Sequence, residues 1–278
     1  MKIRRKISDA ILYAVMTITL TAVLIILVMI IIYILKSAGG YLNLSLLTRP
    51  ASEGGILPMI ITTVYIVLVS IAVAFPVGIC TAIFLNEYSG NSGFIRILRL
   101  AIDTLAGIPS IIYGLFGLLV FCRILGFGQS IIAGALTLSI MILPVIIRTT
   151  KESLKSIPDS FREGSLSLGA TKLQTIVHVV IPSALPGIIN AVILAIGRVV
   201  GESAPVLLTV GLAKNLPKSI FESGRTLTIH LYYLTSEAVR PEDFGMAFAA
   251  ASILVILVLA INTATKFITM AFGNKTKD

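Results

Sequence analysis

Two charged residues, Arg198 and Glu202, lie inside an otherwise apolar segment that runs from about Ser183 to Leu212. A charge deep in a bilayer is costly and persists where it meets a partner or a water-filled path. Because the two residues are four positions apart, they would share one helix face and can bond each other. A guanidinium also matches the oxygens of a tetrahedral oxyanion. Two interpretations are therefore open: a mutual ion pair that only offsets the cost, or a polar lining for an anion's route.

Glu202 sharpens the second interpretation. Its carboxylate can accept a hydrogen bond from a protonated oxyanion, which phosphate offers at neutral pH and sulfate does not. Its charge also limits how tightly Arg198 holds an anion, and a transport path needs release as well as capture. We predict that Arg198 and Glu202 lie on the path of an anionic substrate.

The composition indicates where these residues must be held. Of the 278 residues, 56% are apolar and only 13% are charged, with a mean hydropathy of +1.01. A soluble domain of this length usually carries roughly a quarter charged residues. The formal charge of +9 is spread over short loops and termini without interleaved aromatic residues, so it indicates membrane topology and not nucleic-acid binding.

Six segments are long and apolar enough to cross about 30 Å of hydrocarbon as helices. The sequence therefore predicts an all-α, polytopic membrane protein. The six are Ile11–Leu35, the run between Glu53 and Glu87, Thr104–Cys122, Ile124–Ile147, Ser183 to about Leu212, and Phe244–Thr265.

The basic residues predict the orientation. About two thirds of the Lys and Arg residues fall in the N-terminus, the second and fourth connections and the C-terminus, which predicts that both termini are cytoplasmic. We expect a cytoplasmic N-terminus over 1–10, a first helix over 11–35, and one membrane domain over 57–270. Its inner loop would span 148–182, and 271–278 would form a cytoplasmic C-terminus. The outer stretch 213–243 is moderately apolar, and its re-entry into the membrane is left open.

Motifs for chemistry are missing. The sequence contains no GxxxxGK[ST], HExxH or GxSxG, and His178 and His230 stand alone. Cys80 and Cys122 lie in apolar stretches without a CxxC and indicate packing. We predict no catalytic residue, no cofactor and no metal site, so the chain is not expected to be an enzyme.

The inner segment 160–182, SFREGSLSLGATKLQTIVHVVIP, predicts a docking surface. Asp159 or Ser160 can cap a helix with Glu163 in its first turn. Gly169 allows a tight turn, and 170–180 would form a second short helix that Pro182 ends. The alternative is a solvated loop, but eight apolar side chains at roughly helical spacing favour docking of a partner. These are Phe161, Leu166, Leu168, Leu173, Ile176, Val177, Val179 and Val180.

This segment resembles the EAA loop of ATP-binding-cassette importer permeases. The resemblance is carried by Glu163, by Gly169 six residues later, and by the final Ile181-Pro182. It implies the type I importer permease fold and a coupling helix that inserts into a separate ATPase subunit. The coupling residues it implies are Glu163, Gly164, Ser165, Gly169 and Ala170. Gly164 and Ser165 replace the family's two alanines, which lowers helix propensity but keeps small side chains.

The stretch 197–205, GRVVGESAP, resembles the GRxxGETAP signature of phosphate importer permeases, with Ser203 for Thr. Asp103–Leu115 and the segment 227–251 resemble the A-type subunit of that family. The resemblance covers roughly Leu57 to Phe272. It implies a homologous second permease subunit, an ATPase dimer and an extracytoplasmic phosphate-binding protein as partners, and an inner-membrane location.

Other residues of the third span receive structural interpretations. Asp103 is most simply a helix N-cap, with a substrate-path role as the alternative. Pro109 would kink or break the helix. Gly107, Gly114 and Gly117 would mark contacts between helices. Two functional alternatives also stay open: a permease for another oxyanion or small solute, and an ion-coupled secondary transporter or channel. The second predicts inverted repeats, which the sequence lacks.

Overall fold

The computed structural model describes residues 2–90, 92–239 and 243–274, and within these ranges every regular element is a helix. The longer elements are α1 (Lys2–Ala38), α3 (Leu57–Ile83), α4 (Gly93–Gly107), α6 (Ile131–Lys155), α9 (Ile181–Gly201), α11 (Leu227–Glu237) and α12 (Asp243–Asn274). The shorter helices are α2 (Leu44–Thr48), η1 (Ala51–Glu53), α5 (Ser110–Gly117), α7 (Asp159–Ser167), α8 (Lys172–Thr175) and α10 (Ala204–Thr209). Three π-helical turns, η2 (Phe84–Tyr88), η3 (Leu118–Ile124) and η4 (Ile176–Val180), continue α3, α5 and α8.

Five of the described helices are long and apolar enough to cross a membrane, and a bent pair can supply the sixth. This agrees with the predicted all-α polytopic fold of six spans. The five are Ile11–Ala38, Leu57–Tyr88, Ile131–Lys155, Lys172–Gly201 and Phe244–Phe267.

The third span is a broken helix. Between α4 and α5 the chain turns by 103° at Ile108 and Pro109, both of which have extended ψ angles. A proline disfavours the α conformation in the residue before it, so the break follows from the sequence. The Tyr113 hydroxyl donates to the Leu105 carbonyl oxygen at 2.6 Å and ties the two halves together. The prediction that Pro109 breaks this span is confirmed.

The fifth span differs from the prediction at both ends. The sequence predicts that Pro182 ends a short helix before the span begins. Instead, α8, η4 and α9 form one continuous helix from Lys172 to Gly201. The π-helical turn of η4 precedes Pro182 and accommodates a residue that lacks a backbone N–H. The helix then stops at Gly201, well before Leu212, since Glu202 has an extended backbone.

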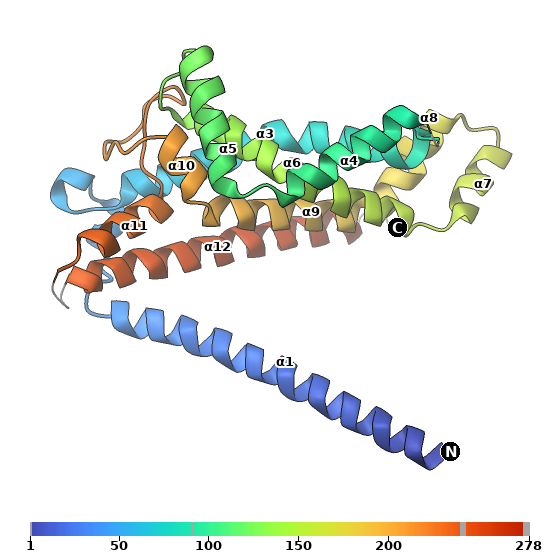
Figure 1. The fold of residues 1–278 in the computed structure, drawn as a ribbon, viewed down its shortest axis with the longest axis horizontal. Helices are drawn as coiled ribbons and strands as arrows, with labels where there is room; N and C mark the ends of the chain where they lie inside the picture. The colour runs from blue at the N-terminus through green and yellow to red at the C-terminus, as the bar shows by residue number, and fades with distance from the viewer. Residues whose placement is uncertain (1, 91, 240–242, 275–278) are drawn as a thin grey trace.

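The helices α3, α6 and α9 form the centre of the molecule (Figure 1). Of the long spans, α6 is the most enclosed, with two thirds of its apolar window buried. Ser139 of α6 donates to the Ser70 carbonyl oxygen of α3 at 3.0 Å, and Ser70 donates to Ala135 at 3.2 Å. Small polar residues thus join the two helices by hydrogen bonds. Apolar side chains alone would give little preference for a neighbouring helix over lipid.

Small residues also bring α5 against its neighbours. A Cβ atom on Gly114 would lie 2.8 Å from the Pro205 Cα, and one on Gly117 would overlap Thr137. The predicted helix contacts at Gly114 and Gly117 are therefore confirmed. The prediction for Gly107 is wrong for this chain, because nothing lies within 4 Å of a Cβ placed there.

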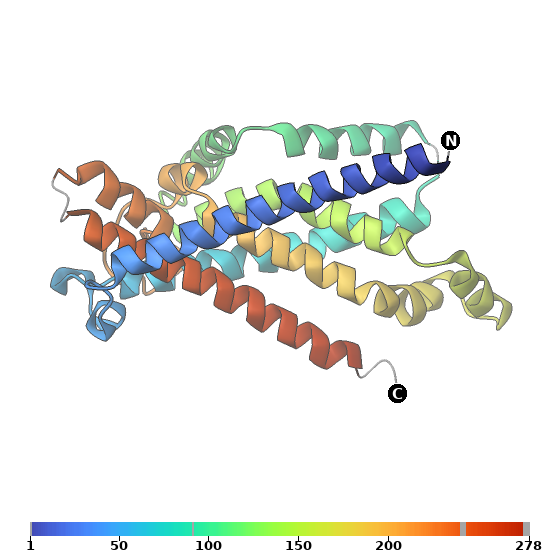
Figure 2. The ribbon, with the colours of Figure 1, turned by 90° about the horizontal axis from the view of Figure 1, so that it is seen from below.

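The first helix stands apart from the rest. None of its apolar window is buried, and in Figure 1 α1 diverges from α12 toward its N-terminal end. Its C-terminal end is anchored, because Ala38 joins a cluster with Ile56, Met59 and Ile253. In both views the N-terminal end of α1 and the C-terminal end of α12 point toward the end of the molecule where α7 lies, and α10 and α11 lie at the opposite end (Figure 2). The predicted topology requires this arrangement.

Candidate functional site

Arg198 lies in the last turn of α9 and Glu202 directly follows the helix end. The Arg198 Nε and a Glu202 carboxylate oxygen are 3.7 Å apart, an ion pair that is too long for a hydrogen bond. The predicted arrangement on one continuous helix face is wrong, because Glu202 has already left the helix. The two charges are nevertheless brought together.

The helix ends here for a local reason. Gly201 has a low helix propensity, Glu202 is extended at φ −78° and ψ 134°, and Pro205 cannot donate a backbone hydrogen bond. The chain restarts as the short helix α10, which packs against α5. An interrupted helix within membrane depth is tolerated where it is buried in protein or lines a cavity.

The guanidinium of Arg198 is free to bind. Its side chain is 35% exposed and that of Glu202 is 18% exposed. Among the described residues the Arg198 side chain makes this ion pair and no hydrogen bond, so its donors can receive an oxyanion. Gly114 of α5 packs against Pro205, three residues after Glu202. The site therefore lies where the broken third span meets the broken end of α9.

A second ion pair corrects the interpretation of Asp103. This residue lies within α4 and is no N-cap; the cap of α4 is Ser92, which accepts from the Ile95 amide. The Arg148 Nη2 donates to an Asp103 carboxylate oxygen at 2.7 Å, and the two side chains are 48% and 64% exposed. The pair joins α4 to α6 on an open face of the chain.

The inner loop forms α7, a turn and the start of α8, and α7 lacks the predicted side-chain cap. Pro158 precedes the helix, while Asp159 is its first residue and accepts from Arg162 at 3.2 Å. Glu163 is exposed on α7. The predicted tight turn at Gly169 is confirmed by its φ of +85°, a left-handed conformation that suits glycine.

The other predicted coupling residues surround this turn. The Ser165 and Thr175 hydroxyl groups lie 3.0 Å apart, and the Ala170 amide donates to the Ser165 carbonyl oxygen. Nothing lies within 4 Å of a Cβ placed on Gly164. A shallow groove of about 470 Å³ follows this side of α7, and its lining residues are Ser160, Phe161, Gly164, Ser165, Leu168 and Val179.

Large apolar side chains rim this groove. Leu168 is 90% exposed and Phe161 is 52% exposed, and no described side chain of α7 is fully buried. Exposed apolar side chains outside the spans are costly unless a partner covers them. Leu166, Leu173 and Val177 are exposed as well, whereas Ile176 and Val180 are buried, so the prediction is wrong for these two residues. Docking of a partner on the exposed ones stays a prediction.

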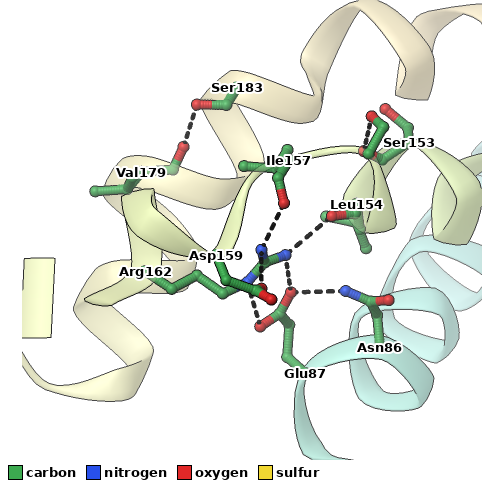
Figure 3. A network of polar contacts seen from close by, with 10 residues as sticks. Asn86, Glu87, Ser153, Leu154, Ile157, Asp159, Arg162, Val179 and Ser183 are labelled. Carbon is green, nitrogen blue, oxygen red and sulfur yellow. Dashed lines mark hydrogen bonds and ion pairs between the residues drawn. The ribbon is translucent and has the colours of Figure 1, made fainter. Parts of the chain in front are cut away.

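One contact between distant segments has no counterpart in the sequence prediction. Arg162 of α7 forms a two-pronged ion pair with Glu87 of η2, 75 positions away (Figure 3). In the sequence Arg162 is only one of many loop charges and Glu87 only marks the end of an apolar run. No local pattern joins them, so sequence reasoning misses the pair.

The described residues offer no support for a bound metal. No group of three His, Cys, Asp or Glu side chains comes together in the ranges that the structure covers. Cys122 is buried, as expected for a packing residue, whereas Cys80 is exposed on α3.

The region that matches a known protein family includes both the loop and the broken end of α9. Residues 74–277 match the family described as binding-protein-dependent transport system inner membrane component. A probable ABC transporter permease protein of Bacillus subtilis, YqgI, is 32% identical over 281 residues, covering 95% of this chain and 96% of the relative. The phosphate transport system permease protein PstA of Mycobacterium leprae is 40% identical over 211 residues, covering 75% of this chain and 68% of that protein.

Solved structures support the fold. The inward-facing MetNI methionine ABC transporter matches with a TM-score of 0.67 at 23% identity, covering 81% of this chain and 99% of the matched chain. A bacterial alginate ABC transporter matches with a TM-score of 0.71 at 16% identity, covering 95% and 96%. The fold is thus that of ABC importer permeases, and the chain belongs to the family of binding-protein-dependent transport system inner membrane components.

Proposed function

We propose that this chain is the permease subunit of an ATP-driven phosphate importer, in which it forms half of the translocation path. The observation that carries the proposal is Arg198. Its guanidinium is 35% exposed at a helix break in the membrane domain and is paired only loosely with Glu202. A fixed positive charge with unused donors suits a tetrahedral oxyanion.

Two further observations support phosphate. The stretch 197–205 resembles the signature of phosphate importer permeases. Relatives that carry the name phosphate transport system permease protein PstA are 40% identical over about three quarters of this chain. The loose spacing of the Arg198–Glu202 pair also suits transient binding, because Glu202 competes for the guanidinium and favours release.

The remaining parts of the importer come from partners. We infer that a dimeric ATPase subunit docks in the groove beside Phe161 and Leu168, and that a homologous permease subunit completes the path. A phosphate-binding protein would deliver substrate at the α10–α11 end. Both termini would then be cytoplasmic, because they lie at the α7 end. This chain itself would hydrolyse no ATP.

Phosphate uptake in reconstituted liposomes tests the path. The complex of both permeases, the ATPase and the binding protein should lose phosphate uptake to background when Arg198→Ala is introduced, while its assembly is unchanged. Arg123→Ala removes an exposed arginine at the outer end of η3 and serves as the matched control. Wild-type uptake by the Arg198→Ala complex would refute the proposed path.

A permease for another solute is the second candidate, since the docking loop is shared among importers of many substrates. In the same liposomes, sulfate or an organic solute that stimulates ATP hydrolysis more than phosphate does would favour it. The family assignment gives no support to the alternative of an ion-coupled secondary transporter or channel.

A further inference from the structure

The guanidinium of Arg162 uses all of its hydrogen-bond donors. Nε and Nη2 donate to the two Glu87 carboxylate oxygens at 3.3 and 2.9 Å. Nη2 also donates to the Leu154 carbonyl oxygen at 2.9 Å, and Nη1 donates to Ile157 at 2.9 Å and to Asp159 at 3.2 Å. An arginine has five N–H donors, so none is left unpaired. Figure 3 shows these bonds converging from several segments on one side chain.

The partners of Arg162 belong to different parts of the membrane domain. Glu87 belongs to η2, which continues α3, Leu154 belongs to the last turn of α6, and Ile157 belongs to the linker that precedes α7. The Glu87 side chain is only 7% exposed and that of Arg162 only 17%. The Asn86 side-chain amide donates at 2.8 Å to Glu87 Oε1, the same oxygen that accepts from Arg162 Nη2, and helps to hold the carboxylate in place.

Tyr88, the next residue of η2, contacts α8. The Lys172 ammonium group lies 4.7 Å from the centre of the Tyr88 ring, and Lys172 begins the long helix that leads to Arg198. Residues 86–88 therefore contact both α7 and α8. They lie in the π-helical turn η2, and such turns are frequent at functional sites.

The hold on α7 depends on these few polar contacts. None of its described residues is fully buried, so α7 has no apolar core of its own against the spans. Apart from the Ser165–Thr175 contact, the side-chain bonds that attach α7 to other elements all pass through Arg162. A buried ion pair contributes little net stability because of its desolvation cost, but it fixes orientation well.

We propose that Arg162 and Glu87 are the positioning residues through which movement of the docked α7 reaches α3 and α6. This inference rests on the proposed function, in which α7 docks an ATPase. In it the apolar rim of α7 provides the attachment to the ATPase, and the two-pronged Arg162–Glu87 pair converts displacement of α7 into rigid movement of the spans. The two tasks lie on different residues of one short helix and are separable by mutation.

The test measures phosphate transported per ATP hydrolysed, alongside copurification of the ATPase. Arg162→Lys keeps the charge but loses the planar fork, and Glu87→Gln keeps the shape but loses the charge. Each should lower the transport-to-ATP ratio about tenfold, within the usual range of coupling effects, while the ATPase still copurifies. The double variant should be no worse than the poorer single variant, because both residues act through the same contact.

Asp159→Asn is the matched control. It removes the exposed ion pair on the same guanidinium and leaves the Glu87 contact intact, so the ratio should stay near wild type. If Glu87→Gln prevents assembly, Asn86→Ala is the milder variant, because it removes one hydrogen bond to the Glu87 carboxylate and keeps the ion pair. It should also lower the transport-to-ATP ratio. An unchanged ratio in assembled Arg162→Lys and Asn86→Ala complexes would overturn the inference.

The result also separates this inference from the proposed function. Phe161→Asp with Leu168→Asp places charge on the docking rim and should abolish copurification of the ATPase. If the ATPase still copurifies with that variant, the docking role fails and the coupling inference fails with it. If it is lost while Glu87→Gln complexes transport with wild-type coupling, only the coupling inference fails.

Discussion

Two arginine–glutamate pairs in this chain are built in opposite ways. Arg162 and Glu87 approach within 2.9 Å, are largely buried and leave no guanidinium donor unused. Arg198 and Glu202 stay 3.7 Å apart, are more exposed and share no hydrogen bond. The first pair is saturated and therefore holds two parts of the protein together. The second leaves its donors free and therefore suits a passing ligand.

The largest effect should come from breaking the saturated pair. Arg162→Ala leaves the buried Glu87 carboxylate without its ion-pair partner and with only the Asn86 hydrogen bond, which should cost about 3–5 kcal/mol of stability. Thermal unfolding of the purified complex in nanodiscs measures this loss. Arg198→Ala, at the open pair, should leave the unfolding midpoint close to wild type. Equal destabilisation by the two variants would remove the distinction between them.

A second effect concerns the packing that places the open pair. Gly114 contacts the backbone of Pro205, three residues after Glu202, and a backbone atom cannot move aside as a side chain can. Gly114→Ala should therefore destabilise the complex by about 1–3 kcal/mol and lower uptake. Gly107→Ala is the matched control, because the space around Gly107 is open. Similar unfolding midpoints for the two variants would argue against tight α5–α10 packing.

A third, smaller effect tests the geometry of binding at the open pair. Arg198→Lys keeps the positive charge but loses the planar fork, so phosphate uptake should fall about tenfold and not to background. Initial uptake rates over a range of phosphate concentrations measure this. Full activity with lysine would mean that charge alone is recognised at this position.

The sequence predicts those features that depend on neighbouring residues. Long apolar runs predict the spans, Pro109 predicts the break between α4 and α5, and Gly169 predicts the turn after α7. Apolarity does not predict the end of α9, because the apolar run continues past Gly201 while the backbone does not stay helical.

Long-range polar contacts were beyond sequence reasoning for a different reason. Glu87 and Arg162 are 75 positions apart, and Asp103 and Arg148 are 45 apart. Their pairing depends on how α3, α4 and α6 pack, which no local spacing encodes. The sequence therefore predicts a cap at Asp103, although this residue lies within α4. The saturated pair, which is central to the coupling inference, is visible only in three dimensions.

The smallest effect concerns the end of the molecule formed by α10 and α11, opposite the saturated pair (Figure 2). Burial, with the nearby charges of Arg225 and Lys214, lowers the pKa of His230 on α11 to about 4. His230 therefore takes up a proton near pH 6.5 in the unfolded chain but only near pH 4 in the folded chain. The free energy of unfolding falls as the pH drops from about 6.5 toward 4. At pH 6 the loss should be about 0.8 kcal/mol.

Unfolding midpoints at pH 7.5 and 6 measure this loss, and His230→Gln should remove this part of the pH dependence. Because the Arg162–Glu87 pair lies at the opposite end, Glu87→Gln should leave the His230 contribution unchanged. A changed contribution would show that the two sites are energetically coupled.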